Sequence, residues 1–404
     1  MNEAGQCGRE SHVLNSKVLI AAVVLAVVTG CEVGKVEDAK VQHVDPESSF
    51  RVDSRPGQPS IADGVVYLGS EAGVLYAVEM ESGRELWHFE TGGPVFHAPL
   101  VIGDLVLFGS RDGRLRAADR SSGDLVWEFE AGRVDWEVHD IFINGIPTVL
   151  DGIAYFSSED FNVYAVEIAT GREVWRHSLG DEPQARQIPV VDRTAYIGAW
   201  DGHLYAIDID TGERVWRSTT DDTGRAALSE QVPFVTVVPI VTDEAVYFTD
   251  WAGNLFAVDR ATGRQVWRFD PGAADSRHVG SRSFMVLDDD VLYYSTLEDH
   301  HLYGVDRHTG KEVWSAETEG IVYGPRAAGG GVGLYAEFLA NKSGDGGTMI
   351  MRAMKLNTRE VLWSAEGAAT GPTLVNGIMY YGGADGTVYG RELISGKKIF
   401  RLGE

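Results

Sequence analysis

Apolar and polar positions alternate in short runs along most of this chain, and one pattern recurs many times. Its clearest copy is Tyr205–Trp216, with the sequence YAIDIDTGERVW. The first three residues have the aromatic and β-branched content of a strand. Turn chemistry follows, because the Asp208 carboxylate can accept hydrogen bonds from turn amides and Gly212 can adopt a positive φ. The pattern predicts a β-hairpin whose second strand carries a large aromatic side chain.

This hairpin returns eight times, and 37 to 51 residues separate the closing aromatic residues of successive copies. Another pair of short apolar segments precedes each copy, as in 188–206. Each repeat therefore supplies four strands, and a four-stranded unit of this period is typical of a propeller blade. We predict an all-β, eight-bladed β-propeller of four-stranded antiparallel blades. The closing aromatic residues of the repeat are Trp87, Trp127, Trp175, Trp216, Trp267, Trp314, Trp363 and Phe400.

The repeated aromatic position invites a functional interpretation, but a structural one explains it better. A ring near the end of each outer strand can wedge between adjacent blades and bury about 150–250 Å². Its indole N–H can then donate to a carbonyl of the neighbouring blade. We therefore expect these residues to hold the ring together rather than to form a site.

The copies differ in a few places that bear on the fold. In the seventh repeat Arg359 stands where the others have the turn glycine, so we expect a different turn geometry there. The first and last repeats both look complete, which predicts a ring closed without strand exchange, although 50–53 could add one strand. Proline at the start of an inner strand is tolerated because that residue needs no ladder N–H. The prolines at these positions are Pro59, Pro99, Pro147, Pro189, Pro239, Pro325 and Pro372, and Met285 replaces proline in the sixth repeat.

The N-terminus reads as an export signal rather than as part of the propeller. Val18–Val28 is an apolar run too short to span a bilayer and of the length of a signal-peptide core. The next residues end in VTGC, which resembles the bacterial lipoprotein box, where cleavage before the cysteine exposes a thiol for acylation. We predict a signal peptide at 1–30, lipidation of Cys31, a flexible tether at 31–56 and the propeller at 57–404. An uncleaved N-terminal anchor is the alternative.

The 404-residue chain carries a net charge of −25, with acidic residues spread throughout. Nothing in it offers a broad basic face to phosphate, which argues against a nucleic-acid partner. A solvated acidic exterior is the simplest interpretation of this charge.

Cationic and aromatic residues gather in the segments that lead into the inner strands, and these segments should converge at one mouth of the central channel. On an acidic protein they would form a local positive spot for an acidic loop or a small anion. Pairing of each arginine with a nearby acid is the alternative. The residues are His97, Trp136, His139, Arg186, Gln187, Arg277, His278, Arg282, Tyr323 and Arg326.

One acidic run, Asp288–Asp290, is the nearest approach to a metal-binding cluster in the sequence. Calcium prefers several oxygen ligands around one point. The run falls where the sixth blade turns between strands, so a solvated turn explains it better, and we predict neither a metal site nor a catalytic residue.

The repeat resembles that of the pyrroloquinoline-quinone (PQQ) dehydrogenases and their relatives over residues 57–404. The shared pattern is Ala-x-Asp-x-x-Thr-Gly-x-x-x-Trp, and the copies at 206–216 and 257–267 match it in full. In those enzymes PQQ lies over the propeller axis, commonly with Ca²⁺ held by Glu, Asn and Asp, and often against a vicinal disulfide. This chain has only Cys7 and Cys31, and it lacks the large inserted segments of the enzymes.

A lipoprotein box combined with eight such blades is more similar to the BamB family, whose propeller is a non-catalytic part of the outer-membrane β-barrel assembly machine. That resemblance implies an envelope protein partner, no cofactor, and a lipid anchor at the periplasmic face of the outer membrane. Glu32 after the cysteine also favours the outer membrane, because many enteric lipoproteins retained at the inner membrane have Asp there. The alternative is a PQQ-dependent oxidoreductase with Ca²⁺, or a quinone- or anion-binding propeller of the envelope.

Overall fold

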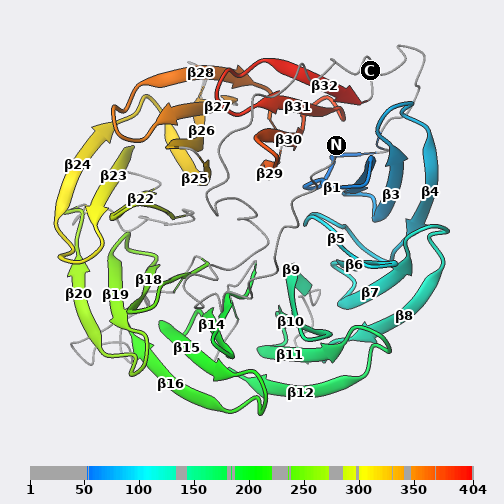
Figure 1. Cartoon of the computed structure of the whole chain (residues 1–404), viewed down its shortest axis with the longest axis horizontal. Helices are drawn as coiled ribbons and strands as arrows, with labels where there is room; N and C mark the ends of the chain where they lie inside the picture. The colour runs from blue at the N-terminus through cyan, green and yellow to red at the C-terminus, as the bar shows by residue number, and fades with distance from the viewer. Residues whose placement is uncertain are drawn as a thin grey trace, which may run out of the picture.

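The computed structural model describes Val52 and residues 54–132, 143–179, 183, 187–220, 235, 238–272, 285–296, 300–329, 331–340, 347–368 and 370–402. These residues form eight four-stranded antiparallel sheets, each with its strands in sequence order. Figure 1 shows the sheets arranged as blades around a central axis, with the first strand of each blade innermost and the fourth at the rim. The predicted all-β, eight-bladed propeller is confirmed.

The strands are numbered in chain order, four to a blade. Blades 1 to 3 comprise β1 (Ser60–Ala62), β2 (Val65–Gly69), β3 (Val74–Glu79), β4 (Glu85–Glu90), β5 (Leu100–Ile102), β6 (Leu105–Gly109), β7 (Arg114–Asp119), β8 (Leu125–Glu130), β9 (Ile143–Leu150), β10 (Ile153–Ser158), β11 (Asn162–Glu167) and β12 (Glu173–Ser178). Blades 4 to 6 comprise β13 (Val190–Val191), β14 (Thr194–Gly198), β15 (His203–Asp208), β16 (Arg214–Thr219), β17 (Ile240–Val241), β18 (Ala245–Thr249), β19 (Leu255–Asp259), β20 (Gln265–Phe269), β21 (Val286–Asp288), β22 (Val291–Ser295), β23 (His301–Asp306) and β24 (Glu312–Glu317). Blades 7 and 8 comprise β25 (Ile321–Gly329), β26 (Val332–Ala340), β27 (Gly347–Lys355), β28 (Val361–Glu366), β29 (Thr373–Val375), β30 (Ile378–Gly382), β31 (Val388–Glu392) and β32 (Lys398–Leu402).

The core lies between the blades. Middle strands such as β14 and β15 are buried along almost their whole length, because each of their faces packs on a neighbouring blade. One apolar cluster joins Tyr196 and Trp216 of blade 4 to Val246 and Phe248 of blade 5. The outer strands alternate buried and exposed positions, as expected for a rim with one wet side.

The ring closes between blades 8 and 1 by packing and a few hydrogen bonds. Val52, only 8% exposed, lies in an apolar cluster with Leu68 of blade 1 and Val388 of blade 8. The Thr373 hydroxyl donates to the Pro59 carbonyl at 2.6 Å. All four strands of both blades come from their own end of the chain, so no strand exchange occurs among the described residues. Val52 is not in a strand, and its neighbours Phe50, Arg51 and Asp53 lie outside the described residues.

In five blades a proline directly precedes the inner strand, as predicted, and Met285 does so in the sixth blade. The remaining two prolines do not stand at a strand start. Pro147 and Pro325 lie inside β9 and β25, which begin at Ile143 and Ile321. Each proline falls where the pairing register shifts, at a β-bulge. A bulged residue makes no ladder bond, so proline is accepted there as it is at a strand start.

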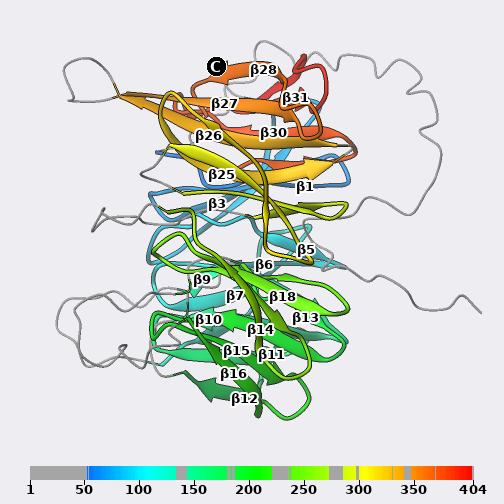
Figure 2. The same ribbon diagram turned by 90° about the vertical axis from the view of Figure 1, so that its left-hand side faces the viewer.

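The antiparallel order gives the ring two different faces, seen from the side in Figure 2. We call loop face the one that carries the connections into each inner strand together with turns such as 199–202. We call hairpin face the opposite one, which carries the repeated turns such as 208–212. Among the described residues, no helix is long and apolar enough to cross a membrane.

Candidate functional site

The repeated tryptophans make the same contact across six blade boundaries. The indole N–H of Trp175 donates to the Ile209 carbonyl of the next blade at 2.8 Å, and that of Trp216 donates to the Arg260 carbonyl at 2.9 Å. Trp216 is 9% exposed. Trp87, Trp127, Trp267 and Trp363 donate likewise, over 2.7–3.0 Å, to Arg120, Ile168, Arg307 and Leu393. Phe400, which has no N–H, closes the series at 5% exposure. These side chains therefore pack and bond between blades.

The repeated turn is shaped to receive the tryptophan of the preceding blade. Asp208 accepts bonds from the backbone N–H of Asp210 and Thr211, and Gly212 has a φ of 73°. A Cβ at Gly212 would come within 2.8 Å of the Trp175 ring. Glycine is therefore required twice, for its left-handed backbone and for the space under the ring.

The turn of blade 7 keeps this geometry without glycine, so the expectation of a different turn there is wrong. Arg359 has a φ of 64°, and its N–H donates to the Lys355 carbonyl at 2.7 Å, as Gly212 does to Asp208 at 2.8 Å. The Trp314 ring lies close to its own blade, which leaves space for the Arg359 side chain. A Cβ at Gly304 would be 2.4 Å from the Trp314 Nε1, and the other blades before the eighth have alanine at that position.

Most of the residues predicted at the channel mouth fall outside the described residues. These are Trp136, His139, Arg186, Arg277, His278 and Arg282. Of the others, His97 precedes β5 and is half-buried, and Gln187 forms a parallel bridge with Ile146 of blade 3. Tyr323 and Arg326 belong to β25. The described members thus come from three different blades of the loop face, and the positive spot stays a prediction.

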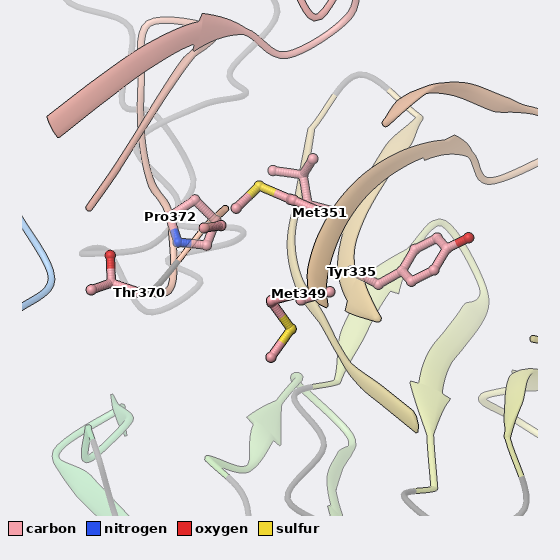
Figure 3. Close-up of a pocket in the computed structure, with 8 residues that line it drawn as sticks. Tyr335, Met349, Met351, Thr370 and Pro372 are labelled. Carbon is pink, nitrogen blue, oxygen red and sulfur yellow. The ribbon is translucent and has the colours of Figure 1, made fainter. Parts of the chain in front are cut away.

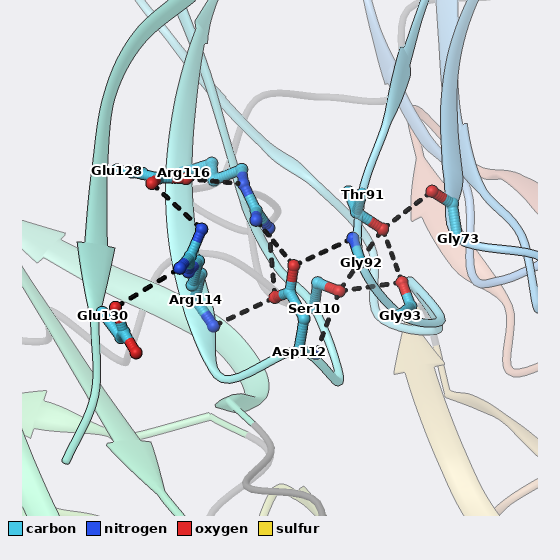
Figure 4. Close-up of polar contacts among 10 residues, drawn as sticks. All are labelled: Gly73, Thr91, Gly92, Gly93, Ser110, Asp112, Arg114, Arg116, Glu128 and Glu130. Atoms are coloured by element: carbon cyan, nitrogen blue, oxygen red, sulfur yellow. Dashed lines mark hydrogen bonds and ion pairs between the residues drawn. The ribbon is translucent and has the colours of Figure 1, made fainter. Parts of the chain in front are cut away.

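Between blades 1 and 2 the loop face carries a buried polar network that the repeat pattern did not reveal (Figure 4). Arg116, 5% exposed, pairs with Asp112 at 2.6 Å and with Glu128 at 3.3 Å. Asp112 also accepts the Gly92 N–H at 3.0 Å. Burial alone would raise the pKa of Asp112, but the bonds and charge of Arg116 outweigh it and lower that pKa. Each guanidinium nitrogen of Arg116 thus bonds to Asp112 or to Glu128.

Three other blades hold the carboxylate at the same turn with a tyrosine four residues later. The pairs are Asp160 with Tyr164, Asp201 with Tyr205, and Asp385 with Tyr389. Burial, with a smaller contribution from Asp160, raises the pKa of Tyr164 to about 12. An acid four residues before a tyrosine or arginine was a visible sequence signal for this pairing.

Blade 5 differs, because its acid stands two residues earlier in the turn, at the position of Ala199 in blade 4. Asp250 is 1% exposed, and Asn254 donates to it through the backbone N–H at 2.9 Å and the side-chain amide at 2.8 Å. The Arg268 guanidinium bonds to Asn254 at 2.9 Å rather than to the acid. Burial therefore dominates and raises the pKa of Asp250 to about 6.

The described residues do not assemble a ligand set for Ca²⁺ or another metal. Asp288 ends β21, Asp289 has a φ of 51° in the turn, and Asp290 accepts bonds from Arg307 and His308. Asp288–Asp290 is thus a solvated turn on the hairpin face. In the part of the chain that the structure describes, no three His, Cys, Asp or Glu side chains lie close enough to share an ion.

An apolar cleft lies between blades 7 and 8 (Figure 3). Met349 and Met351 reach from β27 towards Thr370 and Pro372, which lead into blade 8. Leu334, Ala336 and Ala368 complete most of the lining. Nothing in the repeat pattern indicated this cleft, because it depends on the departures of blade 7 from the other repeats.

Comparisons with solved structures find the same fold in proteins of different kinds. The crystal structure of BamB from Moraxella catarrhalis superposes with a TM-score of 0.66 at 20% identity, covering 84% of this chain and 96% of that one. A europium-containing methanol dehydrogenase gives 0.62 at 16% identity and covers 80% of each chain. The computationally designed Ika8 protein gives 0.61 at 16% identity, covering 84% of this chain and 96% of that one. At these identities the likeness shows the fold alone.

Sequence comparison is more specific. No curated protein matches the chain significantly. The family model described as outer membrane protein assembly factor BamB matches residues 21–135 and 129–316, which together span well over half of the sequence. The chain therefore belongs to the BamB family of PQQ-like repeat propellers.

Proposed function

We propose that this protein is a non-catalytic envelope scaffold that assists assembly of outer-membrane β-barrel proteins through protein–protein contacts. The observation that carries the proposal is the use of the repeat residues. The tryptophan and glycine of the motif bond and pack across blade boundaries, as Trp175 does with Ile209 and Gly212, and the motif aspartate holds the turn that receives the ring. The family membership points the same way. We therefore expect partners to bind at surface residues that differ between blades.

The predicted anchor fits this role. A lipid on Cys31 would hold the chain at the periplasmic face of the outer membrane, and the described propeller begins some twenty residues later. A flexible chain of that length spans roughly 25 Å, so the propeller could stand off the membrane and reach a partner. Converting Cys31 to Ser should release the protein from membranes without changing its melting temperature. Retention in the membrane fraction would contradict the lipid anchor.

The second candidate is a PQQ-dependent oxidoreductase of the envelope, favoured by the structural likeness to a methanol dehydrogenase. That chemistry needs oxygen ligands for Ca²⁺ and a platform for the quinone. The buried acids described on the loop face are already engaged, Asp112 by Arg116 and Asp250 by Asn254. The scaffold is therefore the better supported of the two.

One experiment separates the candidates. The full-length mature protein is titrated with PQQ and CaCl₂ while tryptophan fluorescence and dye reduction with alcohols or sugars are followed. The scaffold predicts no saturable quenching and no dye reduction. Saturable quenching accompanied by dye reduction would overturn it.

Photo-crosslinking in intact envelopes gives the positive arm. A photoreactive residue replaces Glu71, which is exposed in the β2–β3 turn on the loop face. The matched control replaces Thr211, exposed on the hairpin face. We expect the loop-face position to give a discrete product containing the barrel subunit of the assembly machine, and the control to give none. A product without any assembly-machine subunit would argue against this function.

A further inference from the structure

Three strands of blade 7 are longer than their counterparts in the other blades, and they extend above the loop face. The pair Ala336 and Met351 corresponds to Gly198 and Leu204, which is the last pair of the middle strands in blade 4. In blade 7 the pairing continues for four more residue pairs, to Ala340 and Gly347. At about 3.3 Å per residue this adds roughly 13 Å of sheet. Figure 2 shows the ends of β26 and β27 reaching beyond the neighbouring strands.

One face of this extension is apolar and only partly covered. Directly paired residues lie on the same face of a sheet, so Ile321, Phe338 and Met349 form one row across the three strands. All three side chains are partly exposed. Tyr323, Ala336 and Met351 form the next row, closer to the ring.

The apolar face runs continuously into the cleft between blades 7 and 8. Met349 and Met351 belong both to the sheet face and to the cleft lining, opposite Pro372 (Figure 3). Methionine side chains are flexible and polarisable, so they adapt to apolar groups of different shape. We call blade 7 patch the set Ile321, Tyr323, Phe338, Met349, Met351 and Pro372.

The outer edge of β27 ends in backbone groups without a strand partner. Its pairing with β28 stops at Ile350 and Glu366, and beyond that point the Met349 carbonyl accepts only the Gly367 N–H at 3.1 Å. Along a strand, the N–H and C=O of successive residues point to opposite edges. Gly347 is two residues from Met349, so the N–H and C=O of both residues point to the same outer edge. Among the described residues, none bonds to the N–H of Met349 or to either backbone group of Gly347 on this edge. An edge of this kind is a template for an added strand.

Charges beside this edge are acidic. Glu366 is exposed where β28 ends, directly in line with a strand that would continue along β27. The nearby Arg352 is committed to the buried Glu337 at 2.6 Å. A segment docking here would gain from a basic residue at the end that faces Glu366.

We propose that the blade 7 patch and the adjoining edge of β27 bind an extended segment of another protein. The segment adds to β27 as a short strand, places one bulky apolar side chain over Met349 into the cleft, and sets a basic residue beside Glu366. Backbone pairing at a sheet edge supplies affinity and the side-chain pocket supplies selectivity. The proposal goes beyond the assembly role, because it needs neither the lipid anchor nor a particular envelope machine.

The test uses the intact mature protein and a fluorescent synthetic peptide in which Val and Phe alternate with Thr and one end carries two lysines. Fluorescence anisotropy measures binding, and hydrogen exchange follows the Gly347 and Met349 amides. We expect saturable binding and slower exchange at both amides. A peptide of the same sequence, N-methylated on alternate residues, should bind at least tenfold more weakly.

The matched variants are Met349→Glu in the patch and Val313→Glu, which introduces the same charge at a side chain 55% exposed on another blade. Met349→Glu should weaken binding at least tenfold, and Val313→Glu should leave it unchanged. If Met349→Glu melts below the wild type, Ile321→Asn serves as the patch variant. Equal affinities for the wild type and the patch variant would overturn the proposal. So would equal binding of both peptides, an absence of saturation, or self-association of the chain through the same patch.

Discussion

The guanidinium of Arg359 lies over the Trp314 ring, with its Cζ 5.7 Å from the ring centroid. Six of the other blade boundaries place a glycine against the corresponding tryptophan, as Gly212 lies against Trp175. The arginine thus combines an unfavourable left-handed backbone with a cation–π contact at one boundary. This departure occurs in the same blade whose extended strands form the blade 7 patch.

Replacing Arg359 with Gly should raise the free energy of unfolding by up to about 1 kcal/mol. The left-handed conformation costs a non-glycine residue about 1–2 kcal/mol, and the lost cation–π contact is worth about 0.5–1 kcal/mol. Urea denaturation measures the change. Gly212→Ala is the control and should lower the free energy of unfolding. It introduces a side chain at a left-handed residue, and its Cβ would collide with the Trp175 ring. A lower midpoint for Arg359→Gly would mean that the ring contact outweighs the backbone strain.

Trp216→Ala should lower the free energy of unfolding by about 3–5 kcal/mol, the cost of emptying a large buried position. It also leaves the Arg260 carbonyl without its indole donor. Val215→Ala is the control, because Val215 precedes Trp216 in the same strand but is 54% exposed, and it should change stability by less than about 0.5 kcal/mol. Thermal unfolding compares the two. If Trp216→Ala melted like the wild type, the wedge would have no energetic role.

The propeller could be predicted because the information for it is local and repeated. In most copies the strand alternation, the turn acid, the glycine and the closing aromatic agree with one another, as they do at 205–216. Agreement between local preference and global fold makes a pattern readable from sequence. Eight copies also fixed the number of blades.

The remainder depends on contacts between residues far apart in sequence. Proline marks the start of the inner strand in five blades but stands at a bulge at Pro147 and Pro325, which only the pairing register reveals. Arg359 can adopt its left-handed backbone because of where the Trp314 ring lies. The ring can lie there because residue 304 is glycine and has no side chain. The cleft beside Met351 needs blades 7 and 8 together. The channel-mouth prediction rested on topology and charge, and most of its residues lie outside the described part of the chain.

The predicted positive spot can be tested by reversing two of its charges. Arg186→Glu combined with Arg282→Glu should weaken capture of the envelope partner in crosslinking while leaving the melting temperature unchanged. The matched control is Arg84→Glu with Arg172→Glu, two side chains 67% exposed on the hairpin face, which makes the same change in net charge. Unchanged capture by the Arg186 and Arg282 variant, or equal loss with the control pair, would show that these arginines do not form a binding site.

The buried acid of blade 5 should make stability depend on pH in an unusual direction. Burial raises the pKa of Asp250 to about 6, against the lowering effect of Asn254. The folded carboxyl therefore holds its proton where the unfolded one has lost it. Stability relative to Asp250→Asn should fall by about 3 kcal/mol as pH rises from about 4 to about 6. Asp112→Asn is the opposite control, because Arg116 lowers the pKa of Asp112 and that acid stabilises the fold above the ordinary carboxyl pKa. Urea denaturation at several pH values measures both, and a flat difference between wild type and Asp250→Asn would mean that the Asp250 carboxylate is solvated or paired with a cation.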